Sequence, residues 1–136
     1  MIHLKTVLLS LLILSIAPFS MSAADTKITD EISIIAVKMD ADWCGKCKVM
    51  NPKLDALMPE FKDEPVLFVK FNMTDEFTTQ QAGFLADRLN LKSLFNEHKG
   101  QTGYVVLIDA KSGEPLKTLQ SDLSENQIKA EIRSVL

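Results

Sequence analysis

The only two cysteines of the chain lie three residues apart, in the segment Trp43-Cys44-Gly45-Lys46-Cys47. At the start of a helix this spacing places both side chains on one face, so the sulfurs can join as a disulfide or separate as two thiols with little backbone movement. Unpaired amide groups and the helix dipole favour a thiolate at such a position. The segment therefore predicts a nucleophilic Cys44 with a lowered pKa and a more sheltered Cys47.

Two other uses of this cysteine pair remain open at the level of the residues. A purely structural bridge across so short a loop would remove little entropy from the unfolded chain and would stabilise the fold only weakly. A zinc site needs about four ligands, and His98 is the only histidine after residue 24, so we expect no metal of that kind. Two thiolates could still hold a soft ion such as Cu(I).

Residues 1–24 have the pattern of a secretory signal peptide. His3 and Lys5 precede an apolar run over residues 7–16, and the small residues Ser22-Ala23-Ala24 follow it. The run is shorter than the roughly 20 apolar residues of a membrane-spanning helix, which favours cleavage after Ala24 over retention as an anchor. We therefore expect residues 25–136 to be periplasmic or secreted, where two thiols can oxidise.

Length, composition and charge restrict the class of protein. A chain of 136 residues with 46% hydrophobic side chains fits one globular domain. Its formal net charge of -3 provides no basic excess, so nucleic acid is not an expected partner.

The hydrophobic patterns predict an α/β protein with the element order β-α-β-α-β-β-α. Strands are expected at 34–39, 65–72, 104–109 and 116–119, and helices begin near 44, 77 and 124. The second strand is apolar enough to be buried on both faces, and residues 90–102 are expected to form a loop with at most one helical turn. Inward-facing residues are expected to include Met50, Leu54, Leu57, Met58 and Phe61 of the first helix and Phe84, Leu85 and Leu89 of the second.

The chain resembles the thioredoxin family, in its exported bacterial form. The resemblance rests on Ala41-Asp42-Trp43-Cys44-Gly45-Lys46-Cys47-Lys48 with Pro52 beyond it, on Lys70-Phe71-Asn72, and on the Ser112-Gly113-Glu114 and Gln127-Ile128-Lys129 segments. It implies a three-layer sandwich around a mixed four-stranded sheet, with a shortened N-terminal part. It also implies thiol–disulfide exchange through Cys44 as nucleophile and Cys47 as resolving residue, with Trp43, Gly45 and Lys46 in support.

The resemblance also bears on partners and cofactors. Protein thiols or disulfides and a redox partner protein are implied as partners, no organic cofactor is implied, and we expect a monomer. The alternative is a binding module on the same fold that holds Cu(I) or a client protein.

Two positions depart from the family pattern. Lys38 stands where the family often has a buried carboxylate, and we hypothesise that its charge stabilises a Cys47 thiolate and makes the pair more oxidising. Gly103 stands where the family places a cis proline, so substrate docking is expected to differ there. The polar segment with Lys92, His98 and Lys99 is expected to lie near the cysteines and to bias partner choice.

Overall fold

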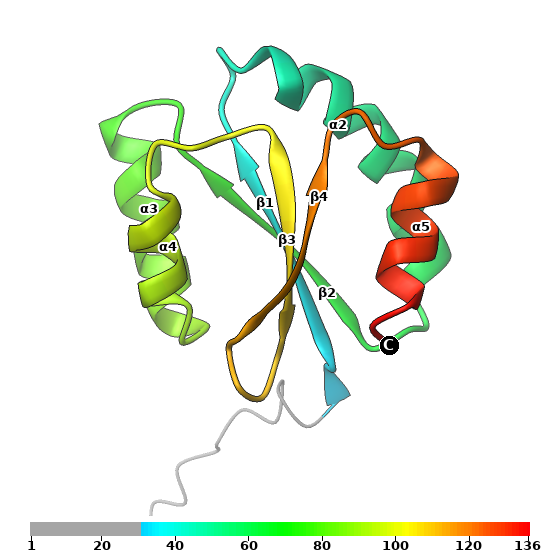
Figure 1. The fold of residues 1–136 in the computed structure, drawn as a ribbon. Coiled ribbons are helices and arrows are strands. Elements are labelled where there is room, and N and C mark those ends of the chain that lie inside the picture. Colours follow the sequence, from blue (N-terminus) through cyan, green and yellow to red (C-terminus); the bar gives the residue numbers. More distant parts are fainter. Residues whose placement is uncertain (1–30) are drawn as a thin grey trace, which may run out of the picture.

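The fold is described from a computed structural model, which places residues 31–136 (Figure 1). The predicted signal peptide, residues 1–24, lies outside the described residues. The predicted domain boundary at residue 25 therefore stays a prediction.

A mixed sheet of four strands forms the centre of the domain. The strands are β1 (Ile34–Asp40), β2 (Val66–Asn72), β3 (Tyr104–Asp109) and β4 (Pro115–Gln120), in the spatial order β2-β1-β3-β4. β1 runs parallel to β2, with Ile34 opposite Val66, and antiparallel to β3, with Met39 opposite Tyr104. Because β1 and β3 have a neighbour on both sides, they are the most deeply buried strands.

Helices cover both faces of this sheet. α2 (Gly45–Leu57) continues into a 3-10 turn, η1 (Met58–Phe61), and is followed by α3 (Glu76–Arg88), α4 (Lys92–His98) and α5 (Glu125–Arg133). Figure 1 shows α2 and α5 on one face and α3 with α4 on the other. The predicted thioredoxin-like three-layer sandwich is confirmed. Within residues 31–136, each helix is too short or too polar to cross a bilayer.

Each face of the sheet has its own hydrophobic core. On the α2 and α5 face, Ala36 and Leu107 of the sheet pack with Met50, Leu54 and Leu57 of α2 and with Ile128 and Ile132 of α5. On the other face, Val37, Met39 and Phe71 pack with Ala82 and Ala86 of α3 and with Leu94 and Phe95 of α4. Side chains of a strand alternate between the two faces, so β1 contributes to both cores.

The turn between β3 and β4 closes the sheet at the end away from the α2 N-terminus (Figure 1). Asp109 Oδ1 accepts hydrogen bonds from the backbone amides of Lys111 and Ser112. Hydrogen bonds from the Ser112 amide and hydroxyl, and then from the Lys111 amide, favour the charged carboxylate and lower the pKa of Asp109. Gly113 completes the turn at φ +73°, a conformation that glycine adopts without steric cost.

The expected inward face of α3 is wrong for Phe84 and Leu85, whereas Leu89, just after the helix, packs on the core as expected. Phe84 is 74% exposed and Leu85 is also exposed, whereas the buried residues of the helix are Ala82 and Ala86. Small residues allow α3 to approach its neighbours closely. A Cβ placed on Gly83 would lie 3.3 Å from the ring of Phe95 in α4, so large side chains fit only on the opposite side.

Three further expectations need correction. The segment after Asn90 forms a helix, α4, whose Leu94 and Phe95 are buried. β2 is an edge strand and is only partly buried. Met58 is exposed because the chain changes to a 3-10 turn there, with Pro59 in its first turn, while Phe61 reaches the core.

Candidate functional site

The cysteine pair forms a disulfide at the N-terminus of α2. Cys44 is the N-cap residue, and Cys44 and Cys47 have Cα atoms 5.2 Å apart. The backbone N–H of Cys47 donates a hydrogen bond to Cys44 Sγ at 3.1 Å. Cys44 is 6% exposed and Cys47 is 1% exposed. The predicted difference between an outer and a more sheltered sulfur therefore agrees with the structure.

A short turn from the central strand positions both sulfurs. β1 ends at Asp40, the N–H of Cys44 donates to the carbonyl oxygen of Ala41 at 3.1 Å, and α2 begins at Gly45. Ala41 is buried against both cysteines. The carbonyl oxygen of Met39 lies 3.7 Å from Cys47 Sγ, so a reduced Cys47 thiol has an acceptor within reach.

Trp43 directly precedes Cys44 and is fixed to the segment that follows β2. Its indole Nε1–H donates to the carbonyl oxygen of Thr74 at 3.0 Å, although the residue as a whole is 60% exposed. The amide of Asp42 donates to Thr74 Oγ1 at 3.0 Å, and this hydroxyl donates to Asn72 Oδ1. Thr74 thus holds the loop before Cys44 through contacts across 31 and 32 residues of sequence, which no local pattern indicates.

Directly after Thr74, a capping box starts α3. Asp75 accepts a hydrogen bond from the Thr78 amide at 2.8 Å, and the Thr78 hydroxyl is bonded to the Asp75 amide. Hydrogen bonds from Thr78 favour the charged carboxylate and lower the pKa of Asp75. The cap fixes the turn on which the Trp43 and Asp42 contacts depend.

Gly103 lies against the other side of the disulfide. Its backbone N–H donates to the Met39 carbonyl oxygen at 2.8 Å, and its φ is +96°. A Cβ at this position would stand 3.3 Å from Cys44 Sγ and 2.5 Å from the Cβ of Lys46. Gly103 therefore lies beside Cys44, and residues 31–136 contain no cis peptide bond.

The two residues between the cysteines have different surroundings. Gly45 faces open space, since a Cβ there would meet no atom within 4 Å. The stem of Lys46 packs on Gly103, while the residue as a whole is exposed. A partner that approaches Cys44 from the Gly103 side therefore meets Lys46.

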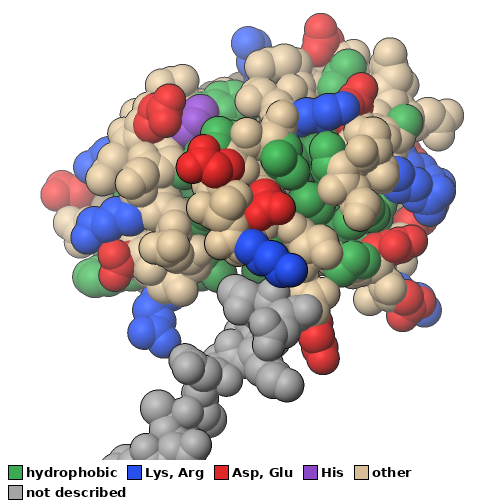
Figure 2. Space-filling model, turned by 60° about the horizontal axis from the view of Figure 1, so that its bottom comes forward, with side chains coloured by type: hydrophobic (Ala, Val, Ile, Leu, Met, Phe, Trp, Pro, Cys, Tyr) green, Lys and Arg blue, Asp and Glu red, His purple; other side chains and the backbone are tan. Residues whose placement is uncertain are grey.

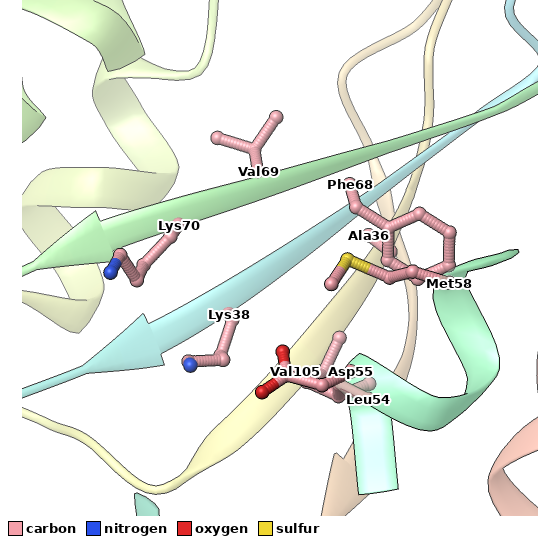
Figure 3. Close-up of a pocket in the computed structure, with 9 residues that line it drawn as sticks. All are labelled: Ala36, Lys38, Leu54, Asp55, Met58, Phe68, Val69, Lys70 and Val105. Carbon is pink, nitrogen blue, oxygen red and sulfur yellow. The ribbon is translucent and has the colours of Figure 1, made fainter. Parts of the chain in front are cut away.

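Lys38 does not extend freely to solvent. Its side chain is 15% exposed, and its ammonium lies 3.4 Å from the carboxylate of Asp40. It lines a cavity of about 210 Å³ between the sheet and the C-terminal half of α2, with Leu54, Asp55 and Lys70 among the other lining residues. Figure 3 shows Lys38 and Lys70 on the adjacent strands β1 and β2, and Asp55 of α2 opposite Lys38.

His98 lies in the segment expected to form a loop and is the half-buried last residue of α4. Its Nδ1 lies 2.7 Å from the hydroxyl of Tyr104, the residue after Gly103. Burial of the phenol and the nearby charge of Glu97 raise the pKa of Tyr104. Lys92 pairs with Asp87 of α3, and α4 packs on α3, whereas Gly103, which follows the polar segment, lies against Cys44.

Acidic and basic side chains are mixed on one face of the molecule. On the face drawn in Figure 2, acidic and basic side chains are interspersed with hydrophobic ones. Within the described part of the chain, groups of three or more His, Cys, Asp and Glu residues that could hold a metal ion are absent.

The fold and this site define an α/β protein with a disulfide at the N-terminus of its first long helix. The Thioredoxin family model matches residues 15–83, about half of the chain. The chain belongs to the thioredoxin family.

Individual relatives match shorter stretches. The chain is 40% identical over 48 residues to Thioredoxin-T of Drosophila melanogaster, a match covering 35% of this chain and 30% of the relative. It is 49% identical over 39 residues to a thioredoxin of Haemophilus influenzae, covering 29% and 36%. The matches thus span about a third of the length of these curated relatives. The solved structure of Trxlp from Edwardsiella tarda aligns with a TM-score of 0.47 and 21% identity over 81% of this chain and 91% of the other.

Proposed function

We propose that the protein is an exported thiol–disulfide oxidoreductase that exchanges disulfides with protein substrates through Cys44 and Cys47. The observation that carries this proposal is the position of the disulfide at the N-terminus of α2, with Cys44 as the cap residue and the Cys47 amide directed at its sulfur. When the bond opens, the unpaired amides of the first helical turn favour a thiolate at Cys44 over a thiol.

The exchange has two steps in the direction of substrate reduction. The Cys44 thiolate attacks one sulfur of a partner disulfide, which forms a mixed disulfide and releases the other partner sulfur as a thiolate that takes up a proton. Cys47 then loses its proton and attacks Cys44 Sγ, which restores the Cys44–Cys47 disulfide and releases the second partner thiol. Two electrons pass from the protein to the partner, and the reverse sequence oxidises a dithiol partner.

Three neighbouring residues support this role. Trp43 directly precedes Cys44 and is exposed, the stem of Lys46 packs on Gly103, and Gly103 borders the Cys44 sulfur without a side chain. The apolar run and small residues within positions 1–24 support export to the periplasm or beyond. Fractionation of cells that produce the full chain tests export, since residues 25–136 should appear outside the cytoplasm without the first 24 residues.

Reduction of insulin with dithiothreitol as electron donor tests the activity. Wild-type protein should accelerate the reaction, Cys44→Ser should abolish the acceleration, and Cys47→Ser should accumulate a mixed disulfide with the partner. A binding module for Cu(I) or a client protein would show no turnover with any of the three proteins, and that result would refute the proposal.

A further inference from the structure

Asp40 is a buried carboxylate that the exchange reaction described above does not use. The residue is 4% exposed at the end of β1. Its Oδ1 lies 3.4 Å from Lys38 Nζ and its Oδ2 lies 4.0 Å from Lys70 Nζ. Within the described residues Oδ1 has no partner in hydrogen-bond geometry, so the two ammonium groups provide its compensation through charge. Lys38, Asp40 and Lys70 are called the charge cluster below.

The charge cluster faces the same layer as Cys47. Side chains alternate along a strand, so Lys38 and Asp40 project to the α2 side of the sheet together with Ala36, which belongs to the core under α2. Cys47 and Leu54 belong to the buried face of α2, and Leu54 lines the same cavity as Lys38. Cys47 Sγ also lies 3.7 Å from the carbonyl oxygen of Met39, which is the residue between Lys38 and Asp40.

Charges in this layer act on the sulfur of Cys47 because water does not screen them fully. A cation near a thiolate stabilises it, and an anion near a thiolate destabilises it. Lys38 alone would therefore favour the reduced pair and make it more oxidising. Asp40, at 3.4 Å from Lys38, opposes that effect.

We propose that Asp40 is a positioning residue that offsets the charge of Lys38 and thereby sets the redox balance of the Cys44–Cys47 pair. The inference rests on the proposed function and refines it, because it assigns opposite effects to two charged residues on the α2 side of the sheet, the layer that contains Cys47. Lys70, which is more exposed and more distant from Asp40, makes a smaller contribution. Asp55 of α2 lies opposite Lys38 in the cavity (Figure 3) and remains unchanged in the test.

The test measures the equilibrium of the cysteine pair with reduced and oxidised glutathione for wild type, Lys38→Met, Asp40→Asn and the double variant. Lys38→Met should make the pair more reducing and Asp40→Asn more oxidising. Each should shift the equilibrium constant by up to about tenfold, which is about 30 mV for a two-electron couple. The double variant should return close to wild type. Lys117→Met is the matched control, because Lys117 of the edge strand β4 pairs with Glu131 of α5, and it should leave the constant unchanged.

The outcomes separate the two proposals. If the wild-type pair cannot be cycled between disulfide and dithiol, the proposed function and this inference both fail. If the wild type cycles but the single variants shift the constant in the same direction, or no more than Lys117→Met does, the inference alone is overturned. If Asp40→Asn fails to fold, the Lys38→Met variant decides the test. A Lys38→Met cysteine pair that is not more reducing than the wild-type pair would contradict the proposal that Lys38 stabilises the Cys47 thiolate.

Discussion

Gly103 stands so close to Cys44 that a single added methyl group would lie 3.3 Å from the Cys44 sulfur. The same methyl group would overlap the Cβ of Lys46. This contact joins the segment before β3 to the N-terminus of α2. It makes the backbone of residue 103, rather than a side chain, the surface that borders the disulfide.

Replacing Gly103 with alanine should therefore destabilise the oxidised protein and slow exchange. The positive φ alone costs an L-residue roughly 1–2 kcal/mol, and the overlap with Lys46 adds to it. Gly100→Ala is the matched control, because Gly100 also has a positive φ, +82°, but its Cβ would meet no atom within 4 Å. Urea unfolding should show a larger loss for Gly103→Ala, and equal losses would contradict the close approach.

Replacing Thr74 with valine should loosen the disulfide loop while the β-branched shape is kept. The variant removes the acceptor for the Asp42 amide, and loss of one such hydrogen bond costs about 0.5–1.5 kcal/mol. Hydrogen exchange at the Asp42 amide should become faster. Thr118→Val, at an exposed position of β4, should leave that exchange rate unchanged; a similar acceleration in both variants would argue against the role of Thr74.

Substitutions on the two faces of α3 should change the free energy of unfolding by different amounts. Phe84→Ser changes an exposed side chain and should alter the free energy of unfolding by no more than about 0.5 kcal/mol. Ala86→Leu overpacks a fully buried position and should cost about 1–3 kcal/mol. Denaturant unfolding of the oxidised protein measures both, and a larger loss for Phe84→Ser would mean that the helix is turned the other way.

Tyr104 should titrate above its ordinary pKa of 10.0, because burial and then Glu97 raise its pKa. It is the only tyrosine in the chain, so tyrosinate absorbance reports it directly. Glu97→Gln should lower the titration midpoint of Tyr104 but leave it above 10.0, because burial of the phenol remains. Between the unfolded and the folded pKa of Tyr104, the folded state binds more protons than the unfolded state. The contribution of Tyr104 to stability is therefore present below the unfolded pKa and is lost as the pH rises through the folded pKa. A midpoint at or below the ordinary value would contradict the burial of the phenol.

Local patterns in the sequence were sufficient to predict the sheet and the position of the cysteines. The apolar runs of β1 and β3 are long enough to identify buried strands, and the spacing of Cys44 and Cys47 places them at a helix start. Ser124 marks the last helix, which the structure confirms with its hydrogen bond from the Gln127 amide.

Features that depend on contacts between distant segments could not be predicted in this way. The size of Phe84 indicated burial, yet close packing of Gly83 against Phe95 leaves space only for small residues on the inner face of α3. α4 gains its stability from the burial of Leu94 and Phe95 rather than from local preference. The pairing of Lys38 with Asp40 could have been suspected, since both are charged residues on one side of an apolar strand.

The turn after β3 gives the domain a site for chemical attachment. Asp109, Ser112 and Gly113 close this turn at the end of the sheet away from the sulfurs (Figure 1), and exposed turns of this kind tolerate added segments. A linker coupled at the exposed Lys111 would present Cys44 outward from a bead or an electrode. An immobilised protein could then meet soluble partners with its reactive end unobstructed.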